Sequence, residues 1–169
     1  MLDLLGSSRS SPGLVGIADG SWWQCEVVGE AVPKGRPRGR IRGKTVQMYT
    51  PERTEIGEAF ARLCWVTQVG VTLLAGPLQV RIITRKRIPR SWPDYLKNAA
   101  ARGRKRPAGK PDADNLAKTI LDALNGVAWI DDGQVVDLTI SKRYAKPGES
   151  EGVTVWVRCW RAKYGEAPF

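Results

Sequence analysis

Four stretches of this sequence alternate apolar and polar residues with a period of two, which is the pattern of a half-buried β-strand. They centre on Cys25, Val80, Leu138 and Val155. Between them lie two stretches with helical spacing, one from about 51 to about 69 and one at 113–125. Strands and helices in this mixture predict an α+β domain, with one sheet of four or more strands and two main helices.

The apolar positions also predict which faces are buried. Five residues on one face of the first helix are expected to point into the core: Ile56, Ala59, Phe60, Leu63 and Val66. In the second helix the core face is Leu116, Ile120 and Leu124. Val136, Leu138 and Ile140 mark a strand after Gly133. Asn125-Gly126 ends the second helix.

A length of 169 residues fits one domain. We expect a loose leader at 1–21, small and polar, and a folded domain at 22–169. Two basic segments interrupt the folded domain. The segment 33–44 is expected to be a loop or a ragged hairpin. The segment 88–110 contains Pro, Gly and many cations and is expected to be a long loop.

The formal net charge of +10 favours a polyanionic partner, nucleic acid before an anionic membrane surface. The chain has no histidine, which excludes His-based triads, His general bases and zinc sites that need imidazole. Its three cysteines are far apart and form no CxxC, so reduced thiols are expected rather than a disulfide framework.

No apolar run approaches the length of a membrane span, and the first twenty residues lack the basic n-region of a secretory signal. A cytoplasmic protein without membrane contact is therefore the expectation.

The charges are segregated along the chain. Residues 81–110 contain eleven cations and one acid, whereas 111–137 contain six acids and one cation, Lys118. Asp112 and Asp114 stand at the start of the second helix, and Asp131 and Asp132 follow its end. Each alone is explained by a helix cap, a turn or a solvated surface. Together, the four carboxylates could lie close to one another in space if a strand ran back beside the helix.

Clustered carboxylates repel one another unless they share protons or hold a cation. Oxygen ligands without His or Cys suit Mg²⁺ or Mn²⁺, and Mg²⁺ held by a few carboxylates usually acts on phosphates. Lys118 shares a helix face with Asp114, where it would neutralise charge on a phosphate or form an ordinary helical ion pair. These residues predict a Mg²⁺-dependent nuclease.

The cations that we expect to bind DNA phosphates come from the two basic segments and the strand before the second. They are Lys34, Arg36, Arg38, Arg85, Lys86, Arg87, Arg102, Arg104, Lys105, Arg106 and Lys110. Trp92 and Tyr95 lie among such cations, either to stack on unpaired bases or to anchor the loop.

Three spaced runs resemble a known signature: KPDADNLAK at 110–118, LDALNG at 121–126 and WIDDGQV at 129–135. The pattern resembles that of RusA-type Holliday junction resolvases, the crossover junction endodeoxyribonucleases of bacteria and their phages. PKGRPR at 33–38 and YTP at 49–51 are similar to the opening of many phage members. The resemblance covers roughly residues 23–160.

The resemblance implies a small fold with a mixed sheet, a homodimer, and paired symmetric nicks in four-way DNA junctions with Mg²⁺ or Mn²⁺. It implies that Asp112, Asp114 and Asp132 are the essential, metal-binding carboxylates and that Lys118 is the active-site lysine. Asp131 is then a support or an alternative ligand. Two coordinated cuts on a pseudo-two-fold junction also require two symmetric sites, and hence a dimer.

The leader at 1–21 has no counterpart in that family, and 88–110 looks longer than its compact version. A preference for flaps or forks therefore stays open, as do the number of metals and the base preference. The alternatives from other classes are a non-catalytic nucleic-acid binder and a metal phosphohydrolase acting on nucleotides.

Overall fold

The computed structural model describes residues 21–36, 38–42 and 45–160. Nearly all of the predicted leader at 1–21 falls outside them. The elements in chain order are β1 (Trp23–Val28), β2 (Arg38–Arg42), β3 (Thr45–Tyr49), α1 (Glu52–Gln68), β4 (Leu78–Lys86), α2 (Asp94–Ala101), α3 (Ala113–Leu124), a 3₁₀ turn (Asp132–Gln134), β5 (Val135–Tyr144) and β6 (Gly152–Cys159).

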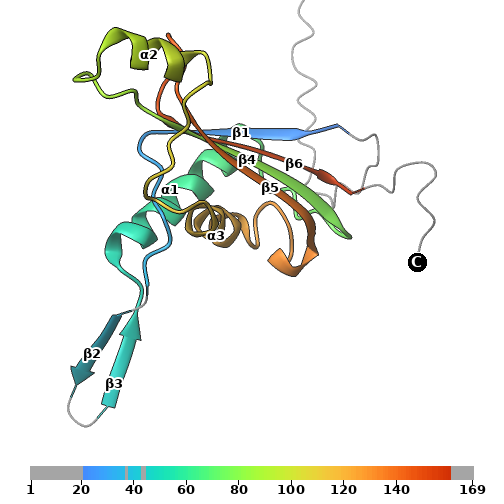
Figure 1. The fold of residues 1–169 in the computed structure, drawn as a ribbon. Coiled ribbons are helices and arrows are strands. Elements are labelled where there is room, and N and C mark those ends of the chain that lie inside the picture. The colour runs from blue at the N-terminus through green and yellow to red at the C-terminus, as the bar shows by residue number, and fades with distance from the viewer. Residues whose placement is uncertain (1–20, 37, 43–44, 161–169) are drawn as a thin grey trace, which may run out of the picture.

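A four-stranded mixed sheet in the order β1-β6-β4-β5 forms the centre of the molecule. Antiparallel ladders join β1 to β6 and β6 to β4, and a parallel ladder joins β4 to the edge strand β5. Helices α1 and α3 cover one face of this sheet (Figure 1). The predicted α+β architecture is therefore confirmed, with α2 as a third helix.

The core lies between the sheet and these two helices. Val80 and Ile82 of β4 are fully buried, as are Trp65 of α1 and Trp129 in the connection after α3. Leu116, Ile120 and Leu124 of α3 are at most 5% exposed, which confirms the predicted core face of that helix. The alternation of apolar residues is a local signal, and here the tertiary packing follows it.

The predicted core face of α1 is wrong. Ile56, Phe60 and Leu63 are 61%, 45% and 60% exposed, and Ala59 and Val66 are also exposed. The helix instead turns Thr54, Ala61 and Trp65 toward the sheet. Both faces of α1 are apolar, and the smaller residues face inward because they allow closer packing around the one large indole. The apolar stripe of α1 has no cover within the described chain.

The edge strand β5 forms where the alternation predicts it, but two of its alternating apolar residues are exposed. Leu138 pairs with the buried Val80, so both side chains are on the helix side of the sheet. Leu138 is nevertheless 42% exposed, and Val136 is 59% exposed. An edge strand has a neighbour on one side alone, and this end of β5 is left open on its helix side.

The segment 88–110 is not the long loop that its composition predicts. It contains α2, which begins after Pro93 and ends before Gly103, a glycine with φ +75°. Three alanines and a short amphipathic repeat make this helix, and eight residues are too few for a strong periodic signal. In the other basic segment the hairpin alternative holds in part: β2 pairs in regular register with β3, which lies beyond the predicted end of the segment at 44.

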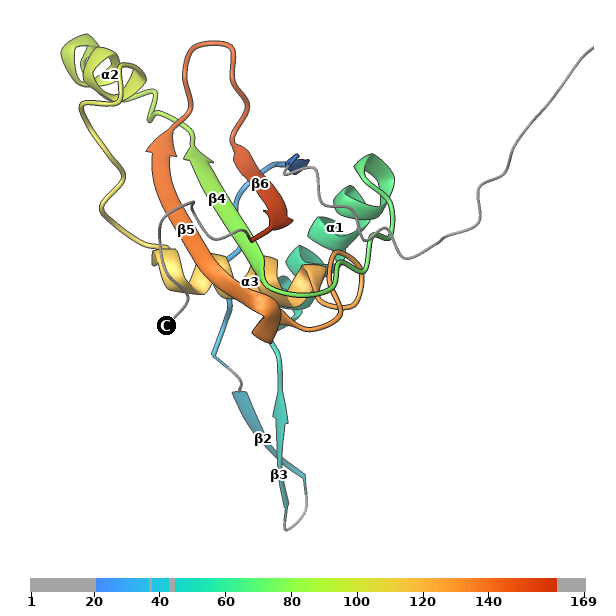
Figure 2. The same ribbon diagram turned by 90° about the vertical axis from the view of Figure 1, so that its right-hand side faces the viewer.

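The elements form two layers, with two extensions at opposite ends. Figures 1 and 2 both show α2 beyond one end of the sheet and the β2–β3 hairpin projecting in the opposite direction. Helix α3 lies between these two extensions. In the described part of the chain, no helix is both long and apolar enough to cross a membrane.

Candidate nuclease site at the ends of helix α3

Two of the predicted carboxylates stand at the N-terminus of α3. Asp112 occupies the N-cap position, but its side chain makes no capping hydrogen bond. Asp114 lies in the first turn, and both residues are exposed to solvent. Negative charge is favoured near the positive end of the helix dipole. Their carboxylate oxygens are therefore available to a cation or to another external ligand.

Lys118 lies one turn after Asp114, on the same helix face. Its Nζ is 3.5 Å from Asp114 Oδ2, and both side chains are more than half exposed. The ordinary helical ion pair considered from the sequence is thus present. An exposed pair of this kind is worth about 0–1 kcal/mol, so a phosphate or a metal ion could displace it at little cost.

The other two acids lie in the turn that leads into β5. Asp131 caps this turn: its Oδ1 accepts from the N–H of Gly133 at 2.8 Å, and Gln134 Oε1 accepts from the N–H of Asp131 at 2.9 Å. This reciprocal arrangement is a capping box. Asp132 is exposed and has no such structural hydrogen bond. Of the two neighbours, Asp132 is the one whose carboxylate is free for a ligand.

These two pairs of acids lie at opposite ends of α3. The N–H of Gly126 donates to the carbonyl of Trp129, which keeps the turn containing Asp132 beside the C-terminus of the helix. Strand β5 then runs back, and Lys142 near its end donates to the carbonyl of Pro111 at 2.8 Å. A strand thus returns beside α3, as expected (Figure 2). It brings Lys142 to Pro111, the residue before Asp112, and leaves Asp132 at the other end of the helix.

The separation is large compared with a metal site. A twelve-residue helix is about 18 Å long, whereas carboxylate oxygens bind Mg²⁺ at about 2.1 Å. Within residues 21–36, 38–42 and 45–160, no three Asp, Glu or Cys side chains lie close enough together to hold a metal ion. One chain therefore brings together Asp112, Asp114 and Lys118, but not Asp132.

A basic groove opens at the N-terminus of α3. Its volume is about 620 Å³, and Asp112 and Asn115 form part of its wall. Five cations line it: Lys34, Arg36, Arg53, Lys86 and Lys110. Lys86 and Lys110 are exposed and have no ion-pair partner among the described residues. Glu30, which pairs with Arg53, also lines the groove, and Asp112 is its second acid, so the groove keeps a net positive charge that suits a phosphate backbone.

Two of the cations predicted to bind DNA are engaged within the protein. Lys34 Nζ lies 2.6 Å from Glu58 of α1 and 2.6 Å from Asp122 of α3. Although burial opposes the ammonium form, hydrogen bonds to these two carboxylates raise the pKa of Lys34. Arg85 is 7% exposed and donates to Glu26, Thr154 and the carbonyl of Ser150. Both side chains hold elements together.

The remaining cations predicted to bind DNA lie in different parts of the fold. Arg36, Lys86 and Lys110 belong to the groove. Arg87, Arg102, Arg104, Lys105 and Arg106 surround α2, and the side chain of Arg38 is outside the described set. Trp92 packs edge-on against Tyr144 with ring centroids 5.3 Å apart, whereas Tyr95 is 71% exposed. Trp92 is thus an anchor, and Tyr95 is not.

The sequence did not point to Lys142. Its Nζ also donates to the carbonyl of Gly109 at 2.9 Å, so it holds the backbone that leads directly to Asp112. Lys142 lies about thirty residues after this segment in the chain. The alternation of β5 was the sole local signal for it, and that pattern does not indicate which distant segment a side chain contacts. The sequence did not point to Arg53 of the groove either, because Arg53 is an isolated cation in a helix of mixed residue types.

Comparison with known proteins bears on this site. The family model described as endodeoxyribonuclease RusA matches residues 29–158. The chain belongs to the RusA endodeoxyribonuclease family. The matched part begins immediately after β1 and ends within β6, and so includes both ends of α3. An uncharacterized protein of Bacillus subtilis (strain 168), YqaN, is 37% identical over 134 residues, which cover 78% of this chain and 92% of the relative.

Proposed function

We propose that this protein is a Mg²⁺-dependent endodeoxyribonuclease that resolves four-way DNA junctions by paired symmetric nicks. The observation that supports this most strongly is the position of Asp112, exposed and uncapped, in the wall of a groove lined by five cations. A phosphodiester backbone held by Arg36, Lys86 and Lys110, the groove cations without an ion-pair partner among the described residues, would lie beside the carboxylates. RusA family membership supplies the reaction class.

Asp112 and Asp114 would hold the metal ion, with Mn²⁺ as a substitute for Mg²⁺. One or two carboxylates together with substrate phosphates are the usual protein contribution to a Mg²⁺ site, and the chain has no histidine to favour zinc. The bound cation would polarise the phosphoryl group and activate water. Lys118, now paired with Asp114, would neutralise charge that develops on the phosphate.

Asp132 would reach this site from a second copy of the chain. Since it lies at the far end of α3 from Asp112, the third carboxylate has to come from a partner related by a two-fold axis. The exposed Val136 and Leu138 follow Asp132 in β5 and offer an apolar surface for such a contact. A homodimer of this kind has two composite sites, as two coordinated nicks require.

The first experiment is cleavage of a labelled synthetic four-way junction and a matched linear duplex, with Mg²⁺ and with EDTA. We expect paired nicks at symmetric positions in the junction, and no cutting of the duplex or in EDTA. Cutting of flaps or forks but not of junctions would keep the chemistry and reject the junction as substrate. Tight junction binding without cutting under any metal would indicate a non-catalytic binder.

The variant Asp114→Asn tests the carboxylate directly. We expect cleavage to fall by about 100-fold or more, the scale for losing one electrostatic group in an active site. Junction binding should be kept or strengthened, because a negative charge beside the phosphate is removed. Asp94→Asn is the matched control for cleavage, since Asp94 is likewise an exposed acid in the first turn of a helix but is not among the residues that line the groove. Equal activity of the two variants would contradict the assignment.

A further inference from the structure

A second basic surface surrounds α2, separate from the groove at α3. We define the α2 arm as residues 87–106. It contains seven cations and one acid, Asp94, which pairs with Lys97 at 3.3 Å. Such a concentration of one charge is unfavourable for the folded state by itself, because like charges repel. The arm therefore needs either counter-ions or an anionic partner.

Five arginines of the arm are exposed and have no ion-pair partner among the described residues: Arg87, Arg90, Arg102, Arg104 and Arg106. None of them makes a side-chain hydrogen bond to a described residue. Elsewhere in the described chain, Arg53, Arg85 and Arg143 each meet a carboxylate. Arginine presents a planar fork of donors that matches phosphate oxygens, which suits these five side chains to a phosphate backbone.

The arm is also held in place rather than free. Trp92 packs against Tyr144 at the end of β5, and Lys105 Nζ lies 5.1 Å above the Trp92 ring. Ala100 on the inner side of α2 is 2% exposed, and Pro107 behind the arm is buried. Because the aromatic contacts fix the arm on the sheet, the backbone that carries its arginines is in place before a ligand arrives, which lowers the entropic cost of binding.

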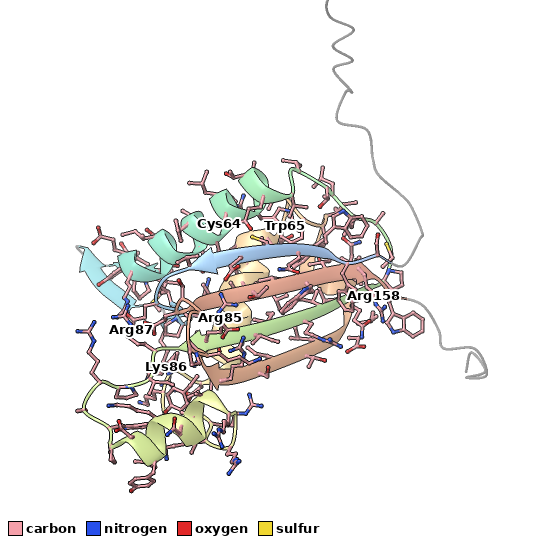
Figure 3. The ribbon with its side chains drawn as sticks, turned by 90° about the horizontal axis from the view of Figure 1, so that it is seen from above. Cys64, Trp65, Arg85, Lys86, Arg87 and Arg158 are labelled. Atoms are coloured by element: carbon pink, nitrogen blue, oxygen red, sulfur yellow. The ribbon has the colours of Figure 1, made fainter. Side chains whose placement is uncertain are left out.

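The arm and the groove are close along the chain and in space. Residues 107–111 lead directly from the arm to Asp112. At the other attachment, β4 ends with Lys86, which lines the groove, and Arg87 begins the arm. Figure 3 shows Arg85, Lys86 and Arg87 together at the end of β4 nearest α2. A DNA backbone in the groove could therefore continue onto the arm.

We infer that the α2 arm is a second DNA-binding surface, which contacts the backbone phosphates of the DNA that extends beyond the groove. This inference rests on the proposed function in one respect, that the anionic partner is DNA. It adds that the arm makes direct contacts through arginines that are distinct from the groove cations. It does not require that the protein cut DNA.

The test compares two triple variants with equal net charge. Arg102→Gln, Arg104→Gln and Arg106→Gln together remove cations from the arm, whereas Arg62→Gln, Arg81→Gln and Arg158→Gln remove three from α1 and the sheet. Both are made in Asp114→Asn protein, and binding to a labelled four-way junction is measured in EDTA from 50 to 200 mM KCl. Thermal unfolding checks that each variant is folded.

Each phosphate contact contributes about 0.9 to the slope of log K against log salt on B-form DNA. If three contacts are lost, the slope of the arm variant falls by about 2.7, so its affinity declines about 40-fold less across this salt range than that of the parent protein. The control variant should keep the parent slope. Equal slopes for the two triple variants would overturn the inference.

The result is separable from that of the nuclease test. If the wild-type protein cuts junctions and the arm variant keeps the parent slope, the arm inference fails and the proposed function stands. If the slope falls and the wild-type protein cuts no DNA with any metal, the arm inference stands and the nuclease proposal fails.

Discussion

Lys142 is the residue through which a distant strand controls the position of Asp112. Its ammonium group donates to the carbonyls of Gly109 and Pro111, which lie three residues and one residue before the N-cap of α3. Hydrogen bonds to charged groups are worth about 1.5–3 kcal/mol each, and losing the donor leaves two carbonyls to find other partners. Lys142 is thus a positioning residue for the proposed metal site, without contact to the metal itself.

Replacing Lys142 by Met should loosen this connection while β5 is kept. We expect the Mg²⁺ concentration for half-maximal cleavage to rise by about 10- to 100-fold, the effect typical of residues that orient metal ligands. Lys142→Arg keeps the donors and should recover part of the loss. If Lys142 has only a structural role, Lys142→Met should lower the melting temperature and leave the Mg²⁺ dependence of cleavage unchanged. That result would contradict the assignment.

At the scale of elements, the β5–β6 connection depends on one ion pair. Arg143 at the end of β5 donates to both carboxylate oxygens of Glu149, at 2.5 and 3.0 Å. The N–H of Lys146 also donates to Glu149. The hydrogen bonds from Arg143 lower the pKa of Glu149 to about 2, against the opposing effect of burial. The ionised carboxylate therefore closes the turn that leads β5 back into β6.

The variant Glu149→Gln should lower the unfolding free energy by about 1 kcal/mol at pH 7, because the pair is partly exposed and screened by solvent. A depressed carboxyl pKa contributes stability above its unfolded value, near 4.5, and loses it as the pH falls toward about 2. Urea unfolding at several pH values should show that the difference in unfolding free energy between wild type and variant becomes smaller as the pH falls over this range. A constant difference down to pH 2.5 would refute the ion pair as its cause.

At the scale of the whole molecule, the main consequence of the fold is that α3 separates the predicted ligands. The helix places Asp112 and Asp114 at one end and Asp132 at the other. The apolar stripe of α1 and the open end of β5 show that the described chain leaves hydrophobic surface uncovered on its helix side. Two copies related by a two-fold axis would bring one end of α3 toward the opposite end of its partner.

Mixing two inactive variants tests this arrangement. If each site combines Asp114 of one chain with Asp132 of the other, a heterodimer of Asp114→Asn and Asp132→Asn subunits contains one site with both substitutions and one intact site. We expect an equimolar mixture to nick junctions in one strand, with about a quarter of all sites active after the subunits have exchanged at random, because half of the dimers are then heterodimers with one intact site each. The separate variants should be inactive.

The opposite outcome is equally clear. If each site uses Asp114 and Asp132 of the same chain, every site in the heterodimer has lost one carboxylate and the mixture stays inactive. Mixing Asp114→Asn with Asp112→Asn is the control, because both substitutions affect the same end of α3. In a composite dimer that mixture also lacks an intact site.

Local patterns in the sequence were sufficient for much of this protein. The alternation around Val80 and Val155, the extent and core face of α3, and the family resemblance all depend on neighbouring residues, and the fold and the family match confirm them. The tertiary structure alone decided which face of α1 is buried, that Lys34 and Arg85 bind acids within the protein, and that Asp132 stays remote from Asp112. These outcomes depend on contacts between residues far apart in the chain, for which periodicity and charge provide no local signal.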